Sequence, residues 1–223
     1  DRYAMAQGSS NNCGPLSMIN NLVQVPSNRV KLLQLYEQNG NQVTVHALGN
    51  TSSKITFDLN NLKTLDDGVL ADTSYGLKML EYKGQRGHGE GYCIPSHGIG
   101  KDNNFGHGLV LDGDSQICYA DLINSTPRIP NVQMGIDKVG NAVDLTPLEK
   151  ELRTIGNGKT MIASGGDSEL GYARGTGIDH FTSIIDSKNG NVRLVNPNST
   201  GDYQDVPITE YTRWYASGCF DNI

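Results

Sequence analysis

The chain has no apolar run approaching the roughly 18 residues that a membrane span needs, and it shows no signal-peptide pattern. It also lacks a dense basic cluster, because its 18 lysines and arginines are interspersed among 24 acidic residues, for a formal net charge of −6. A protein that follows a phosphate backbone needs a basic surface. These absences argue against membrane insertion and against nucleic acid as the main partner.

Cysteine is scarce, and its four residues form no CxxC pair: they stand at Cys13, Cys93, Cys118 and Cys219. If Cys13 acts as a thiolate, three cysteines remain, and an odd number does not suit a disulfide framework, although two of the three could still form one disulfide. We expect mostly reduced thiols and a reducing place of action. Because the chain begins at Asp1 and not with methionine, we also expect that an upstream region has been removed.

Glycine, in contrast, is plentiful, with 27 residues in a chain of 223 whose hydrophobic fraction is 36%. This composition is typical of a loop-rich globular protein, and the length suits one domain over residues 1–223. We expect a helical part over about 1–85, a loop-rich insertion over about 84–108 and a β-rich part over about 109–223. The expected fold class is therefore α+β.

The spacing of apolar residues predicts the order of the helices and strands. We expect helices from Cys13 to about Val25 and over about 28–38, 73–82, 144–152 and 208–215. In the second of these, Val30, Leu33 and Leu35 are expected to share one face. We expect strands over 42–48, 54–59, 109–111, 116–122, 160–163, 181–186 and 192–195.

The stretch from Gln7 to Asn20 contains a cysteine where a polar turn meets the start of a helix. Glycine, serine and asparagine precede Cys13, Pro15 follows it, and apolar side chains then recur at helical intervals. At a helix start, unpaired backbone N–H groups and the positive end of the dipole favour thiolate over thiol. Cys13 is therefore a candidate nucleophile, and the amide of Gln7, six residues earlier, can reach the same place.

A histidine and an asparagine are predicted to meet at one end of a β-hairpin. His180 directly precedes strand 181–186, and Asn196 directly follows strand 192–195. Antiparallel pairing through a turn brings the beginning of the first strand beside the end of the second. An amide oxygen there can accept the imidazole N–H and orient the ring, and the ring can then pair with the thiolate of Cys13.

This combination resembles the papain-like cysteine peptidases: a glutamine six residues before a helix-opening cysteine, a distant histidine, and an asparagine sixteen residues after it. The Asn-Cys-Gly-Pro turn and the Asn-Pro ending are more similar to compact bacterial members, including C39-like peptidases and papain-like toxin or effector domains, than to cathepsins. The resemblance implies a papain-like fold, in which an N-terminal helical part carrying the nucleophile packs on a C-terminal antiparallel β-sheet.

The resemblance also implies a role for each residue of the pattern. Cys13 is the nucleophile, His180 the general base and acid, and Asn196 the residue that orients the histidine. Gln7 and the backbone N–H of Cys13 would stabilise the oxyanion. The resemblance implies no cofactor, and it does not cover residues from about 40 to 165.

Two glycine-rich segments, 84–108 and 165–177, are candidates for framing a substrate cleft, since glycine lets an extended substrate approach closely. We expect Gly177, Ile178 and Asp179, which lead into His180, to bind substrate. The first segment also contains soft potential ligands, but they match no compact zinc signature, and we expect no metal site. These ligands are His88, Cys93, His97 and His107.

The expected activity is hydrolysis of peptide bonds in a protein or peptide substrate. The resemblance implies a bacterial toxin or effector, secreted or delivered into a target cell and acting in a reducing cytosol, with an immunity or inhibitor protein as a further partner. Three alternatives stay open. The same residues could serve a glutamine deamidase or transglutaminase, or an amidase of cell-wall peptides, and the fold could also be a non-catalytic binding module.

Overall fold

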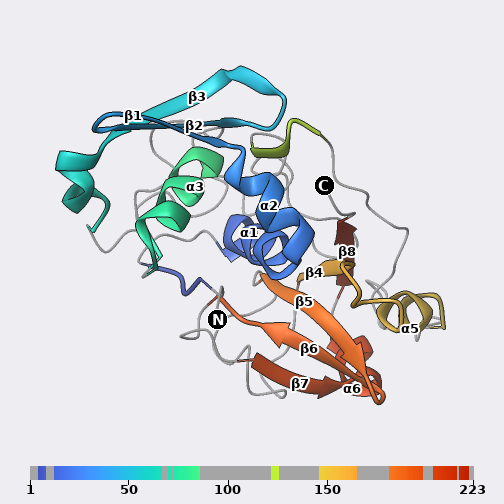
Figure 1. The fold of residues 1–223 in the computed structure, drawn as a ribbon. Helices are drawn as coiled ribbons and strands as arrows, with labels where there is room; N and C mark the ends of the chain where they lie inside the picture. The colour runs from blue at the N-terminus through green and yellow to red at the C-terminus, as the bar shows by residue number, and fades with distance from the viewer. Residues whose placement is uncertain are drawn as a thin grey trace, which may run out of the picture.

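The computed structural model describes residues 5–8, 13–66, 70–71, 73–85, 122–125, 146–164, 181–197, 203–214 and 216–220. Helices and a three-stranded sheet form the N-terminal part, and a five-stranded antiparallel sheet forms the C-terminal part (Figure 1). The predicted α+β class is confirmed at this level.

Two helices open the N-terminal part, α1 (Cys13–Gln24) and α2 (Pro26–Leu33). Helix α1 begins and ends where the sequence predicts. Helix α2 begins two residues before the predicted 28–38, at Pro26, whose missing N–H is not needed in a first turn. It also ends earlier than predicted, at Leu33, and the chain is in a strand by Tyr36.

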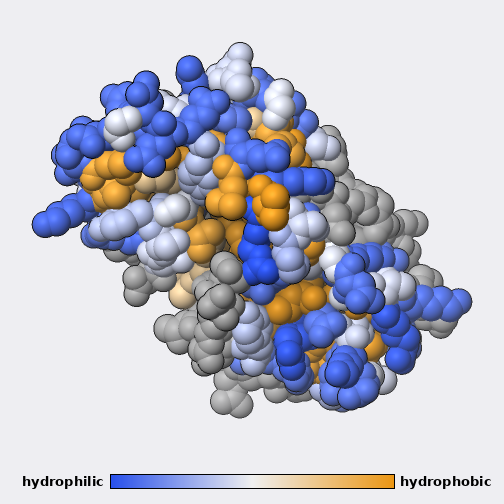
Figure 2. Space-filling model, in the orientation of Figure 1, coloured by the Kyte–Doolittle hydropathy of each residue, from blue (hydrophilic) through white to orange (hydrophobic). Residues whose placement is uncertain are grey.

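The buried face of α2 differs from the predicted one. Val30 and Leu33 are 64% and 70% exposed, and apolar side chains gather on this face of the molecule over α2 (Figure 2). The buried residues of α2 are instead Asn28 and Leu32, four residues apart on one face of the helix. Of the three residues expected to share one face, Val30 and Leu33 lie three residues apart on the exposed side, whereas Leu35 is buried just after the helix has ended.

The N-terminal sheet has the order β1 (Tyr36–Asn39), β2 (Gln42–Ala47), β3 (Asn50–Asp58), with antiparallel pairs. Strands β2 and β3 confirm the predicted hairpin, while β1 falls where a helix was expected. A 3-10 helix, η1 (Leu59–Leu65), and helix α3 (Tyr75–Gln85) complete this part. Helix α3 begins and ends two to three residues later than predicted.

The C-terminal part begins with α5 (Thr146–Leu152) and contains β4 (Thr160–Ser164), β5 (Phe181–Lys188), β6 (Asn191–Val195), β7 (Tyr203–Pro207), α6 (Ile208–Trp214) and β8 (Ala216–Phe220). The strand order is β7-β6-β5-β4-β8. The predicted hairpin β5–β6 and both predicted helices are confirmed, whereas β7 and β8 were not predicted.

Two other sequence predictions concern the middle of the chain. Strand 109–111 and residues 86–108 of the loop-rich insertion lie outside the described residues. Of strand 116–122 only Leu122 is described, and it is helical, so the prediction is wrong at that residue.

Buried apolar residues form two clusters. The first joins α1 and α2 to the N-terminal sheet and α3, and the second fills the space between the C-terminal sheet and helices α5 and α6. Helix α1 belongs to the first cluster and also packs on β5 and β4. It is therefore the element through which the two parts meet, as Figure 1 shows.

Candidate active site

Cys13 is the first residue of α1, so its sulfur stands in the turn where backbone N–H groups lack intrahelical partners. It carries a thiol and belongs to the first apolar cluster, together with Met5 and Leu16. Only 5% of the residue is exposed. Although polar residues precede Cys13 in the sequence, the residue is buried, because it shares an apolar cluster with residues from both sides of it in sequence.

Helix α1 packs on strand β5. The hydroxyl of Ser183 donates a buried hydrogen bond of 2.7 Å to the carbonyl oxygen of Ser17. Further along both elements, Gln24 and Asp186 line one cavity of about 560 Å³. Ser17 lies one helical turn after Cys13, so the beginning of α1 is close to Ser183, the third residue of β5.

The sheet register brings the end of β6 beside this part of β5. Ser183 pairs with Val195, the last residue of β6, and Ser164, the last residue of β4, pairs with Phe181 at the start of β5. Asn196 directly follows β6 and is 3% exposed. The predicted proximity of the beginning of β5 to the end of β6 is confirmed.

Gln7 lies beside the chain that follows β6. Its backbone N–H donates a hydrogen bond of 2.6 Å to the carbonyl oxygen of Pro197. The N-terminal segment therefore reaches the end of the sheet at which Asn196 lies. Of the four predicted catalytic residues, three are described, and they lie on α1, after β6 and beside Pro197.

The fourth, His180, lies outside the described residues, as do Gly177, Ile178 and Asp179, which were predicted to bind substrate. His180 is the residue immediately before β5 in the chain. The expected role of each of these four residues stays a prediction.

A polar stripe on α1 is a feature that sequence reasoning missed. Ser17, Asn20 and Gln24 follow Cys13 at intervals of four, three and four residues, which places all of them on one face of the helix. The side chain of Asn20 binds the backbone of Met5, and Gln24 Oε1 accepts from the Tyr203 hydroxyl at 3.4 Å. Ser17 is bound through its backbone carbonyl oxygen, and its hydroxyl forms no hydrogen bond within the described residues. The signal was present in the sequence, as polar residues with helical period among apolar ones.

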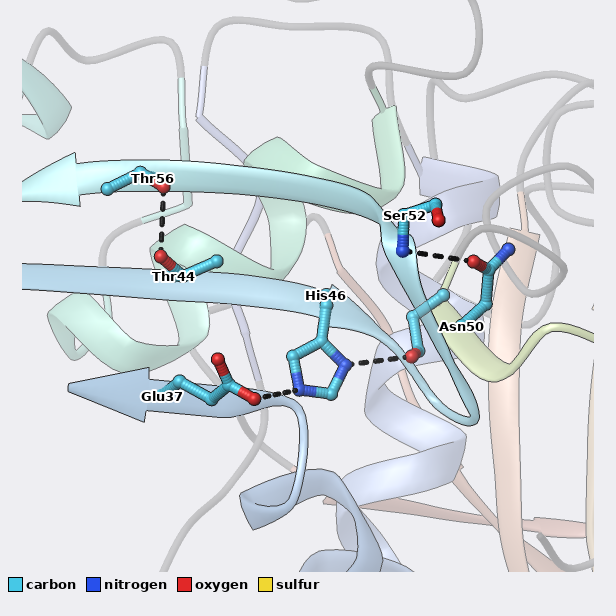
Figure 3. Close-up of polar contacts among 7 residues, drawn as sticks. Glu37, Thr44, His46, Asn50, Ser52 and Thr56 are labelled. Carbon is cyan, nitrogen blue, oxygen red and sulfur yellow. Dashed lines mark hydrogen bonds and ion pairs between the residues drawn. The ribbon is translucent and has the colours of Figure 1, made fainter.

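Histidine occurs among the described residues only at His46, in β2, and it is engaged elsewhere (Figure 3). Its Nδ1 lies 2.9 Å from the carbonyl oxygen of Ala47, and its Nε2 lies 3.6 Å from Glu37 Oε1. Because both ring nitrogens face these oxygens, we assign His46 a structural role in the N-terminal sheet.

No group of histidine, cysteine and carboxylate side chains suited to a metal ion occurs in the described part of the chain. The four potential ligands of segment 84–108, which are His88, Cys93, His97 and His107, lie outside it. None of the described helices has the length and apolar character that crossing a membrane requires.

No protein-family model, curated protein or solved structure matches this chain.

Proposed function

We propose that this chain is a papain-like cysteine peptidase that hydrolyses amide bonds of a protein or peptide. The observation that carries the proposal is the hydrogen bond from Ser183 to Ser17, which lies one helical turn after Cys13. Ser183 pairs with Val195, the residue before Asn196, so this bond joins the first turns of the helix that Cys13 opens to the end of the sheet at which Asn196 lies. The hydrogen bond from Gln7 to Pro197 brings Gln7, the proposed oxyanion donor, to that end of the sheet as well.

The mechanism begins after the proton of the Cys13 thiol has passed to His180, which gives a thiolate paired with an imidazolium. The sulfur attacks the carbonyl carbon, and the backbone N–H of Cys13 and the Gln7 amide stabilise the negative oxygen that results. His180 then gives its proton to the leaving amine, and the C–N bond breaks. In the second half, His180 removes a proton from water, and the hydroxide attacks the carbonyl carbon of the Cys13 thioester. The C–S bond then breaks, which releases the acid product and restores the Cys13 thiolate beside protonated His180. Asn196 orients the imidazole throughout.

The first test is the reactivity of Cys13 with iodoacetamide as a function of pH, measured by peptide mass spectrometry. A thiol paired with imidazolium at a helix start has a pKa well below the free value of about 8.5. We expect Cys13 to react at a pH where Cys219 in the same molecule does not, and His180→Ala to abolish this difference. Equal reactivity of both cysteines would favour a non-catalytic binding module.

The second test is a search for cleaved proteins that compares the wild type with Cys13→Ala. We expect new protein termini with the wild type only, and Cys219→Ala, the matched control, should produce the same termini as the wild type. Conversion of glutamine to glutamate without a cut would overturn the peptidase assignment in favour of a deamidase. Purified peptidoglycan, tested in parallel, identifies a cell-wall amidase.

A further inference from the structure

We propose that Asn20 is a positioning residue that holds Gln7 in place for oxyanion stabilisation. The inference rests on the proposed function and adds to it a residue that the resemblance does not include. It starts from the polar stripe of α1, on which Asn20 follows Cys13 by seven residues. This interval is close to two turns, so both side chains leave the same face of the helix.

Asn20 binds the N-terminal segment as a neighbouring strand would. Its Oδ1 accepts the backbone N–H of Met5 at 2.8 Å, and its Nδ2 donates to the carbonyl oxygen of Met5 at 3.4 Å. Neither residue has any exposed surface. Because buried polar groups without a partner are costly, this two-bond contact strongly favours one position for the backbone at Met5.

The same segment is fixed a second time, two residues later in the chain, where Gln7 N–H donates to Pro197 O at 2.6 Å. One attachment belongs to the helix that carries Cys13, and the other belongs to the chain that follows Asn196. The position of Gln7 relative to Cys13 therefore depends on Asn20. Loss of the two hydrogen bonds to Met5 would remove this attachment of the segment to α1.

This arrangement predicts a particular kinetic defect. An oxyanion donor acts only when negative charge develops, so a displaced donor lowers kcat and leaves KM nearly unchanged. Alkylation of the thiol by iodoacetamide does not use the oxyanion site. If Asn20 positions Gln7, an enzyme without the Asn20 contact turns over slowly. Its Cys13 is still alkylated by iodoacetamide at the wild-type rate and with the wild-type pH profile.

The experiment uses Asn20→Leu, which removes both bonds to Met5, and Asn21→Leu as the matched control. Asn21 is the next residue of α1, is 1% exposed, and its side chain forms no hydrogen bond with any residue that the structure describes. With a cleaved peptide as substrate, we expect Asn20→Leu to lower kcat by about 10- to 100-fold, below the loss of about 10²- to 10³-fold expected for Gln7→Ala. Asn21→Leu should keep the wild-type kcat.

The double variant Gln7→Ala/Asn20→Leu decides whether Asn20 acts through Gln7. If it does, kcat of the double variant equals that of Gln7→Ala, because the donor to be positioned is already absent. Multiplicative losses, or a changed alkylation profile in Asn20→Leu, would overturn the inference and leave the peptidase assignment standing. Absence of Cys13-dependent turnover in the wild type would overturn both.

Asn20→Asp keeps the experiment decisive should Asn20→Leu not fold. It retains the oxygen that accepts from Met5 N–H and loses the amide N–H that donates to Met5 O. We expect a kcat between those of the wild type and Gln7→Ala, and the double variant Gln7→Ala/Asn20→Asp should have the kcat of Gln7→Ala. A kcat equal to that of the wild type would contradict the positioning role.

Discussion

Single polar side chains join parts of this chain that are far apart in sequence. The Ser183–Ser17 hydrogen bond spans 166 residues, and it is buried. Such a bond contributes about 1 kcal/mol net to the free energy of unfolding, less than the cost of leaving a buried partner alone. Its importance lies in specificity, because it sets the position of α1 along β5.

The first prediction at this scale compares two neighbouring residues of β5. Ser183→Ala removes the bond to Ser17 and should lower the free energy of unfolding by about 1 kcal/mol. Thr182 is equally buried, and its hydroxyl forms no hydrogen bond within the described residues. Thr182→Val should therefore be neutral or stabilising by up to about 1 kcal/mol. Urea unfolding measures both, and an equal loss for the two variants would refute the account.

The second prediction concerns Asp66. Hydrogen bonds from Lys78, which has the larger effect, and from Tyr75 hold the pKa of its carboxyl below the usual 3.8. The unfolded chain therefore takes up the proton first as the pH falls, so Asp66 stabilises the fold above pH 3.8 and loses this effect as the pH drops through the lower folded pKa.

The melting temperature, measured from neutral pH to below pH 3.8, tests this prediction for Asp66. The wild type should melt higher than Asp66→Asn at neutral pH, and the difference should disappear in acid. Tyr75→Phe removes one of the two hydrogen bonds, so its pH dependence should lie between those of the wild type and Asp66→Asn. A difference between wild type and Asp66→Asn that stays constant down to the lowest pH would contradict the assignment.

At the scale of elements, the turn between β5 and β6 determines which residues meet at the opposite end of the hairpin. Asn189 and Gly190 have φ values of +53° and +78°, the left-handed region that a tight two-residue hairpin turn requires. With this turn, Lys188 pairs with Asn191, and Ser183 consequently pairs with Val195. A bulge between Ile184 and Asp186 takes up one residue of difference along the way.

The third prediction tests this turn with two Gly→Ala substitutions. A Cβ at Gly190 or at Gly76 would meet no atom within 4 Å, so neither substitution creates a clash. Gly190→Ala should cost about 1 kcal/mol, because alanine disfavours the left-handed conformation. Gly76 is helical, and Gly76→Ala should stabilise by about 0.5 kcal/mol. Chemical denaturation gives both values, and changes of the same sign would contradict the conformational explanation.

At the scale of the whole molecule, α1 couples the two apolar clusters. It contributes residues to the first cluster and packs on the sheet that covers the second. Separate unfolding of the two parts would expose the interface between α1 and β5, including the Ser183–Ser17 bond. We therefore expect the two parts to unfold together, in one cooperative transition.

The fourth prediction follows from this coupling. Leu80 belongs to the first cluster and Leu194 to the second, and they are 2% and 0% exposed. Leu80→Ala and Leu194→Ala should each cost about 2–5 kcal/mol. Both should shift the same single transition, followed by far-ultraviolet and near-ultraviolet circular dichroism. Two separate transitions, each moved by one variant only, would show that the parts are independent.

The sequence predicted the strands that lie inside the C-terminal sheet better than those at the edges. Strands β4, β5 and β6 are rich in apolar and β-branched residues, and they were predicted closely. Strands β1, β7 and β8 were missed, and each lies at the edge of its sheet. Edge strands such as β1, whose sequence is Tyr-Glu-Gln-Asn, carry little apolar signal because most of their side chains remain in water.

By itself, the sequence determined the features that depend on neighbouring residues: the start of α1 at Cys13, the hairpin after His180 and the position of Asn196 at its end. Helical period, turn chemistry and strand alternation act over a few residues, so they are readable along the chain. Only the tertiary structure decided the burial of Cys13, the packing of α1 on β5 through Ser17 and Ser183, and the attachment of Met5 to Asn20. These depend on contacts between segments distant in sequence, and no local preference encodes which buried polar groups become partners.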